Sequence, residues 1–211
     1  MLMENEIDLF GEVKPAAQKR ATKVEKVSKE ARSGTFTDNM KLPIHRWFRY
    51  SAGFSAEWAE TLIEQEKTGS NLTVLDPFAG SGTTLLAAEH AGVCSYGLES
   101  HPFVARIARV KLLWHKIDPA KYIKEINFLI EKSKECKSEF PSNKSELLAK
   151  CYSDESLNKL LSLKSEFLKR NNNTPTDQLL WLTITAILRA CSHAGTAQWQ
   201  YILPNKTKAK V

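Results

Sequence analysis

The sequence lacks the paired cysteines and the long apolar runs that are typical of disulfide-rich, zinc-binding or membrane proteins. Its four cysteines are Cys94, Cys136, Cys151 and Cys191, and no two of them have C-x-x-C spacing. We therefore expect free thiols, with neither disulfides nor zinc. The five histidines show no ligand spacing, so no metal is predicted. The most apolar segment, residues 179–190, is too short to span a bilayer.

The N-terminus also lacks the features of a signal peptide, because Glu4, Glu6 and Asp8 precede any apolar run. We therefore expect a cytoplasmic protein with no membrane partner. The chain has 211 residues, of which 42% are hydrophobic. That is enough for one sizeable core and predicts one domain with appendages.

Basic residues outnumber acidic ones, 30 to 24, which gives a net charge of +6. This excess permits nucleic acid binding without requiring it. It is concentrated between Val13 and Arg32. Residues 1–40 have no sustained helical or strand period, so we predict a mobile basic arm there. The arm either contacts phosphates or is a solvated leader, and the sequence favours neither.

The stretch V-L-D-P-F-A-G-S-G-T-T at residues 74–84 organises the chain. It predicts a buried strand, a tight turn and the start of a helix over residues 83–91. Gly80 and Gly82 let the backbone of the turn approach a ligand, since no Cβ stands in the way. The new helix would expose its first N–H groups there. In a doubly wound sheet, such a strand end is where a nucleotide-like ligand binds.

A second strand is predicted over residues 93–99 and ends in Glu99. An acid at the end of the second strand, about 20 residues after the glycine turn, binds ribose hydroxyls in nucleotide-binding sheets. One carboxylate can accept hydrogen bonds from both hydroxyls. A helix over residues 103–116 should follow, with Pro102 early in it, where its missing N–H costs nothing.

Residues 44–55 alternate aromatic residues with arginine. Such a stretch can meet a nucleic acid backbone or a stacked base. Its aromatics can equally belong to the core, and we expect core positions for at least half of them.

The other segments predict helices. Ser55 is a typical N-cap for a helix over residues 56–66. Residues 119–175 have helical periods and a charged surface, which indicates a helical insertion. Thr176 is predicted to cap the apolar helix that opens the last segment, residues 176–211. The rest of this segment is expected to be a linker towards a missing catalytic half.

The turn departs from the dinucleotide fingerprint G-x-G-x-x-G, because Leu85 stands where the third glycine would be. The carboxylate of Asp76 in front of the turn disfavours a pyrophosphate and favours a ligand with a cationic end. S-adenosylmethionine fits, since it has an amino group, a sulfonium and a ribose but no phosphate. In this interpretation Asp76 and the turn bind its methionine end, and Glu99 binds its ribose.

The motif D-P-F-A-G-S-G-T-T at residues 76–84 resembles the cofactor motif of the amino-methylating DNA methyltransferases, which make N4-methylcytosine or N6-methyladenine. The later Y-G-L-E-S-H-P at residues 96–102 resembles the second motif of that family, in which the acid binds ribose. G-F-S at residues 53–55 resembles the element before the cofactor motif in members arranged cofactor half first, where its aromatic lies by the methionine moiety. G-T-A-Q-W at residues 195–199 resembles a linker ahead of the catalytic half.

This resemblance implies a partial Rossmann-like α/β methyltransferase sheet over residues 41–118. It implies DNA as a partner, and DNA methylation in a restriction–modification system. The implied binding site for S-adenosylmethionine consists of Asp76, Pro77, Phe78, Ala79, Gly80, Ser81, Gly82, Thr83, Thr84, Glu99, Ser100 and Phe54.

The catalytic motif of the family, [Asp/Asn/Ser]-Pro-Pro-[Tyr/Phe/Trp], is absent, because no two of the eight prolines are adjacent. In that motif the polar group accepts from the exocyclic amine and the aromatic stacks on the flipped base. We therefore predict no catalytic residue in this chain. We interpret it as the cofactor-binding part of a DNA methyltransferase, inactive alone, with cytosine N4 favoured over adenine N6. The catalytic half is expected on a complementary methyltransferase subunit, or the sequence is truncated.

Two other functions fit parts of the pattern. Some RNA guanine-N2 methyltransferases carry a similar D-P-F-x-G-S-G turn, but the segments at 53–55 and 195–199 argue against that function. A degenerate, non-catalytic module that binds DNA or a partner would explain the missing catalytic motif. The intact turn argues against it, because such a module has no need of Asp76 and Glu99 together.

Overall fold

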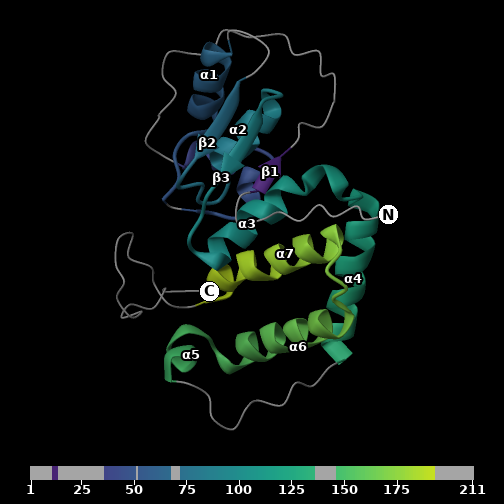
Figure 1. Cartoon of the computed structure of the whole chain (residues 1–211). Helices are drawn as coiled ribbons and strands as arrows, with labels where there is room; N and C mark the ends of the chain where they lie inside the picture. The colour runs from purple at the N-terminus through teal and green to yellow at the C-terminus, as the bar shows by residue number, and fades with distance from the viewer. Residues whose placement is uncertain (1–10, 14–35, 51, 68–71, 136–145, 193–211) are drawn as a thin grey trace. The chain divides into compact units, whose positions relative to one another are not determined.

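The chain divides into two units, which we call the sheet unit (residues 1–116) and the helical unit (residues 117–211). The computed structural model describes residues 11–13, 36–50, 52–67, 72–135 and 146–192 (Figure 1). Each unit has an apolar cluster of its own. The chain therefore differs from the single core with appendages that the composition predicts.

Three strands form the sheet, in the order β1-β3-β2. The predicted pair is present, with β2 (Thr73–Asp76) parallel to β3 (Cys94–Gly97) and Asp76 opposite Gly97. The prediction that the first strand is buried is wrong, because Leu75 on β2 is 63% exposed. The second strand is also shorter than the predicted range 93–99. The third strand, β1 (Gly11–Val13), pairs antiparallel with β3. It lies inside the segment for which the sequence predicts a mobile arm. A pairing of three residues with a distant strand leaves no local period from which to predict it.

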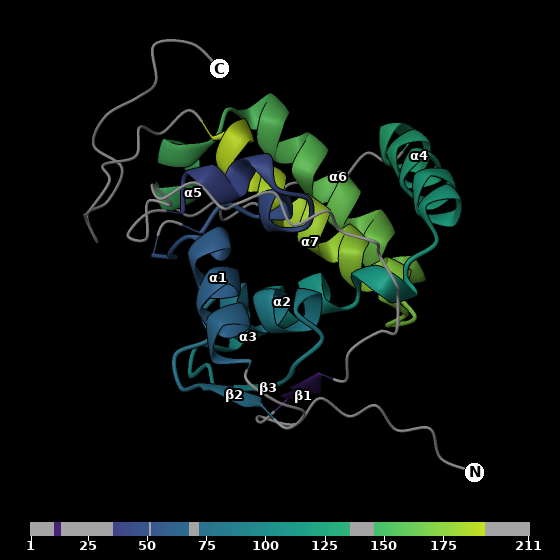
Figure 2. The same cartoon turned by 90° about the horizontal axis from the view of Figure 1, so that it is seen from above.

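The described residues of the sheet unit also form three α-helices: α1 (Ala56–Glu66), α2 (Thr83–His90) and α3 (Pro102–Leu112). Figure 2 shows α1 and α2 on the same side of the strands. Their contact is made by small and branched residues, which form a buried cluster: Ala59, Ile63, Ala87, Ala88, Ala91 and Val93. Three short 3-10 helices lie in the connections that the structure describes: η1 (Asp38–Lys41), η2 (His45–Trp47) and η3 (Trp114–Lys116).

The ends of these helices follow the local sequence closely. Ser55 caps α1 as predicted, and its hydroxyl accepts a hydrogen bond from the Trp58 N–H at 3.3 Å. Pro102 is in the first turn of α3. The predicted helix over 103–116 is too long, because α3 ends at Leu112. The last three residues of the predicted range form the separate 3-10 helix η3.

Gly97 explains how α2 packs on the sheet without a third glycine in the turn. A Cβ on this residue would lie 2.8 Å from the Leu85 Cδ1 atom and 2.9 Å from the Ala79 Cβ atom. The room that G-x-G-x-x-G proteins provide on the helix is provided here on the facing strand. Leu85 can therefore be large and buried, at 5% exposure.

The packed part of the sheet unit begins earlier than residue 41, the predicted boundary. Phe36 is 5% exposed and Asn39 is 1% exposed. The predicted arm is therefore too long at its C-terminal end. Residues 1–10 and 14–35, which make up most of it, lie outside the described residues.

The helical unit contains α4 (Pro119–Glu135), α5 (Glu146–Cys151), α6 (Asp154–Arg170) and α7 (Pro175–Cys191). In Figure 1, α4 runs across the C-terminal part of α6 and the N-terminal part of α7. Leu129, Phe167 and Leu180 form the buried centre of this arrangement. The apolar helix after residue 175 therefore belongs with the helical insertion, and the predicted boundary between 119–175 and 176–211 divides a single cluster.

Thr174, and not Thr176, caps α7. Its hydroxyl accepts from the Asp177 N–H at 3.2 Å, and the Asp177 carboxylate accepts from the Thr174 N–H at 3.0 Å. This reciprocal pair is a capping box, and Pro175 occupies the first helical position. The predicted linker at 193–211 lies outside the described residues.

No helix in the described part of the chain is long and apolar enough to cross a membrane. Cys94, Cys151 and Cys191 are free thiols.

Candidate cofactor site

The turn between β2 and α2 is built around the Asp76 carboxylate. Its Oδ1 atom accepts from the Phe78 N–H at 3.0 Å, and its Oδ2 atom accepts from the Thr84 hydroxyl. The Asp76 carbonyl oxygen also accepts from the Leu98 N–H at 2.8 Å, just after β3. One residue therefore joins the end of β2, the turn and the first turn of α2.

Glu99 closes the same turn from the other strand. Its Oε2 atom accepts from the Gly80 N–H at 3.0 Å, and its Oε1 atom accepts from the His101 N–H at 2.8 Å. A carboxylate oxygen can accept more than one hydrogen bond. Each oxygen of Glu99 thus retains acceptor capacity after it has bonded the backbone.

The turn needs glycine at two positions. Gly80 has φ +52° and Gly82 has φ +86°, in the left-handed region that side chains with a Cβ rarely adopt. A Cβ on Gly82 would also lie 3.2 Å from the Ala108 Cβ atom on α3. These glycines let the chain reverse tightly and bring α2 close to α3.

A cavity of about 220 Å³ opens beside this turn. Seven of the predicted site residues line it: Phe54, Phe78, Ala79, Gly80, Ser81, Thr83 and Glu99. The other five predicted residues, Asp76, Pro77, Gly82, Thr84 and Ser100, are not among the residues that line it. The contacts of Asp76 shape the turn, whereas the sequence predicts that this carboxylate faces the ligand.

Three lining residues were not among the predicted site residues: Tyr50, Ala52 and Gly53. Tyr50 lies close to the turn, since a Cβ on Gly80 would be 3.2 Å from its Cε1 atom. The alternation of aromatics and arginines over residues 44–55 is the signal that could have indicated it. That pattern alone does not say which aromatic faces a ligand.

The cavity has aromatic walls and one unsatisfied polar group. Phe54 packs edge-to-face on Trp58 with ring centroids 5.7 Å apart, whereas Phe78 is 86% exposed. The Ser81 hydroxyl is buried and has no hydrogen-bond partner among the described residues. Buried hydroxyls are normally bonded, so this atom is available to a ligand.

Two buried bases lie elsewhere in the sheet unit. Lys111 is 0% exposed, and burial lowers its pKa to about 8. Its ammonium lies over the Phe36 ring, 5.6 Å from the centroid. Burial, together with the charge of Lys111, lowers the pKa of His45 to about 4, so His45 is neutral near pH 7.

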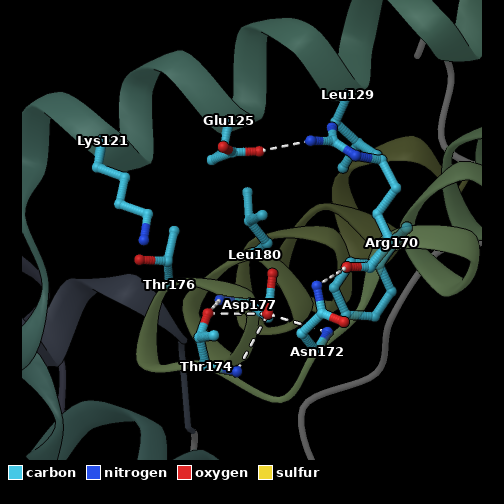
Figure 3. A pocket seen from close by; sticks show the side chains of 10 residues that line it. Lys121, Glu125, Leu129, Arg170, Asn172, Thr174, Thr176, Asp177 and Leu180 are labelled. Atoms are coloured by element: carbon cyan, nitrogen blue, oxygen red, sulfur yellow. Dashed lines mark hydrogen bonds and ion pairs between the residues drawn. The ribbon is translucent and has the colours of Figure 1, made fainter.

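A second cavity, of about 280 Å³, lies in the helical unit at the start of α7 (Figure 3). Most of the charged side chains that line it form ion pairs or hydrogen bonds with neighbouring residues. Arg170 pairs with Glu125 at 2.9 Å, and Asp177 Oδ2 accepts from the N–H groups of Asn172 and Thr174. Only Lys121 among its lining residues is a cation without an ion pair in the described structure. The first cavity is therefore the better candidate for a cofactor.

Residues 12–110 match the family model described as DNA methylase, of the N6/N4 methyltransferase type. This part of the chain is similar to proteins of the DNA methylase family. The match includes β2, the glycine turn, β3 and every residue that lines the first cavity.

Several curated proteins are similar to the chain. Type II methyltransferase M.BsoBI of Geobacillus stearothermophilus is 36% identical over 131 residues, which are 58% of this chain and 24% of that protein. Type II methyltransferase M.AvaI of Nostoc sp. is 38% identical over 77 residues, 36% of this chain and 16% of that protein. Type II methyltransferase M.MjaII of Methanocaldococcus jannaschii is 33% identical over 92 residues, 44% of this chain and 17% of that protein.

The chain thus spans about a quarter or less of the length of these relatives. No solved structure matches it. Within the described ranges, no group of three or more His, Cys, Asp or Glu side chains could hold a metal ion.

Proposed function

We propose that this chain is the cofactor-binding part of a DNA amino-methyltransferase, with a partial Rossmann-like sheet. The reaction would transfer a methyl group from S-adenosylmethionine to an exocyclic amine of DNA, with cytosine N4 favoured over adenine N6. The observation that carries the proposal is the first cavity, where the family's turn and the Glu99 carboxylate meet.

The residues that line the cavity fit this cofactor. The ribose hydroxyls would donate to Glu99, whose oxygens retain acceptor capacity. The buried Ser81 hydroxyl, without a partner in the described structure, would bond a polar group of the ligand. Phe54 and Phe78 would supply apolar contact, the former beside the methionine part, as the resemblance implies.

The acceptor site would lie outside this sequence. When bound, S-adenosylmethionine supplies an electrophilic methyl group on its sulfonium. Its transfer needs a group that accepts from the exocyclic amine and an aromatic that stacks on the base. The sequence has no two adjacent prolines with which to build the family's motif for that task. We propose that a complementary methyltransferase chain, or further sequence of the same protein, supplies it, and that this chain is inactive alone.

Calorimetric titration with S-adenosylmethionine tests the proposal. We expect saturable binding to the unsubstituted chain. Phe78→Ala should weaken it about tenfold, the loss that corresponds to about 1.4 kcal/mol of apolar contact. Phe78 is 86% exposed, so its removal should leave the fold intact. Leu168→Ala removes a side chain of similar type that is 59% exposed in the helical unit, and it should bind as the unsubstituted chain does.

Two results would contradict the proposal. One is the absence of saturable binding by the folded chain at millimolar cofactor. The other is methylation of duplex DNA by the purified chain alone, because that would require an acceptor site within these residues.

A non-catalytic module that binds DNA or a partner is the second candidate, and the missing Pro-Pro pair favours it. Such a module would bind a DNA duplex equally well with and without the cofactor. It would also give no heat with S-adenosylmethionine, so the same titration separates the two functions.

A further inference from the structure

Asn39 holds the segment that forms one wall of the first cavity. It is 1% exposed. Its Nδ2 group donates to the Phe54 carbonyl oxygen at 2.8 Å, and its Oδ1 atom accepts from the Ala56 N–H at 2.8 Å. One side chain therefore bonds the backbone on both sides of Ser55, where the wall enters α1. A buried amide bonded at both ends fixes its partners, because breaking either bond would leave a buried polar group unsatisfied.

Phe36 restrains the same segment by close packing of its ring against the backbone. It is 5% exposed, and a Cβ on Gly53 would lie only 2.4 Å from the Phe36 Cδ2 atom. The ring therefore lies directly against the backbone of Gly53, which lines the cavity. The Asn39 N–H donates to the Phe36 carbonyl oxygen at 3.1 Å, so a single turn of chain carries both residues. We call Phe36 and Asn39 the clamp.

We propose that the clamp is a positioning device that holds Gly53 and Phe54 as a rigid wall before the cofactor enters. Neither Phe36 nor Asn39 lines the cavity, so the clamp acts only through the segment it holds. A wall that is already ordered saves the ligand the free energy of ordering it. This inference rests on the proposed function, which supplies the cofactor.

The clamp should affect one end of the cofactor and not the other. Glu99 is held by the Gly80 and His101 N–H groups, and no clamp residue takes part in those bonds. In the proposed site Phe54 contacts the methionine part and Glu99 binds the ribose. The compound 5′-methylthioadenosine has the ribose and the base but lacks the amino acid part. A loosened clamp should therefore weaken binding of S-adenosylmethionine and spare binding of 5′-methylthioadenosine.

The test titrates Asn39→Ala and the unsubstituted chain with both compounds. We expect Asn39→Ala to bind S-adenosylmethionine about tenfold more weakly, because the competent wall is then populated only part of the time. Its affinity for 5′-methylthioadenosine should not change. Asn39→Asp should show the same selective loss, since a carboxylate still accepts from the Ala56 N–H but cannot donate to the Phe54 carbonyl oxygen. Thr61→Ala, which removes an exposed hydrogen bond within α1, is the control and should bind both compounds normally.

Unchanged affinity of Asn39→Ala for S-adenosylmethionine would overturn the clamp. Equal losses for both compounds would also overturn it, because they would indicate general loosening of the fold. If the unsubstituted chain binds neither compound, the proposed function itself fails and the role of the clamp fails with it.

Gly53→Ala is the second variant, for the case that Asn39→Ala does not fold. Its Cβ would displace the Phe36 ring without removing a hydrogen-bonding side chain. The same selective loss of S-adenosylmethionine binding is expected, and normal binding of S-adenosylmethionine by this variant would overturn the proposal.

Discussion

The Glu99 carboxylate accepts a hydrogen bond from the Gly80 N–H at 3.0 Å, and this bond joins the chain that leaves β3 to the glycine turn that leaves β2. The other oxygen of Glu99 accepts from the His101 N–H at 2.8 Å, one residue before α3. One acid thereby aligns the two connections that border the first cavity. Its position makes Glu99 a residue of the fold as well as a candidate ligand of the cofactor.

We predict that Glu99→Ala weakens binding of both S-adenosylmethionine and 5′-methylthioadenosine by at least about tenfold. Hydrogen bonds to a charged group contribute about 1.5–3 kcal/mol each, and both compounds carry the ribose. Glu99→Gln keeps one acceptor oxygen and should lose less. Calorimetry measures both affinities. Glu57→Ala, at an exposed position of α1, is the control and should bind both compounds normally. A normal isotherm for Glu99→Ala would rule out that Glu99 binds the ribose.

Local signals in the sequence predict those features that are formed by residues close to one another in the sequence. The turn at residues 76–84, the Ser55 cap and the start of α3 at Pro102 all agree with the structure. The T-x-x-D pattern that places the cap of α7 at Thr174 is also local. The prediction of Thr176, two residues later, is wrong because Thr174 is the threonine that stands three residues before Asp177.

Contacts that join distant segments could not be predicted in this way. Tyr50 lies beside Gly80, and Asn39 bonds Phe54 and Ala56. No period or spacing in the sequence relates these positions. The pairing of β1 with β3 could not be predicted for the same reason. A strand of three residues is specified by its partner strand and not by its own sequence pattern.

Gly82→Ala should destabilise the chain more than Gly92→Ala. Both glycines have positive φ, +86° and +67°, and a left-handed residue with a Cβ costs about 1–2 kcal/mol. Only Gly82 adds a steric cost, because its Cβ would lie 3.2 Å from the Ala108 Cβ atom, whereas nothing lies within 4 Å of a Cβ on Gly92. Urea denaturation measures both free energies of unfolding. Equal losses would show that α2 and α3 can move apart without cost.

Thr174→Val should cost about 1 kcal/mol of stability, since it removes the hydroxyl that accepts from the Asp177 N–H. Thr176→Val is the matched control. Thr176 is 6% exposed, and its hydroxyl makes no hydrogen bond in the described part of the chain. The substitution keeps its shape, so we expect a change below about 0.5 kcal/mol. Thermal or urea unfolding measures both free energies of unfolding. A larger loss for Thr176→Val than for Thr174→Val would indicate that Thr176 is the cap.

Lys111→Met should stabilise the chain at pH 7. It should also reduce the rise of the free energy of unfolding with pH above pH 8. Lys111 is 0% exposed, its Nζ atom has no hydrogen-bond partner among the described residues, and burial lowers its pKa to about 8 from 10.5. Below pH 8 both the folded and the unfolded states carry the charge, so the full cost of burying it is present. Between pH 8 and pH 10.5 the unfolded state binds more protons, and the free energy of unfolding rises with pH, by about 3 kcal/mol at about 1.4 kcal/mol per pKa unit.

Urea denaturation between pH 7 and pH 10 measures this rise. Lys116→Met, at an exposed position of the same unit, removes one positive charge without removing a buried one and should keep the rise. Methionine is similar in length to lysine without its ammonium, and it fills irregular apolar space well. A stability profile of Lys111→Met that rises as steeply as that of the unsubstituted chain would show that Lys111 is not the group that titrates. A loss of stability at pH 7 would show that the contact of the ammonium with the Phe36 ring outweighs the cost of its burial.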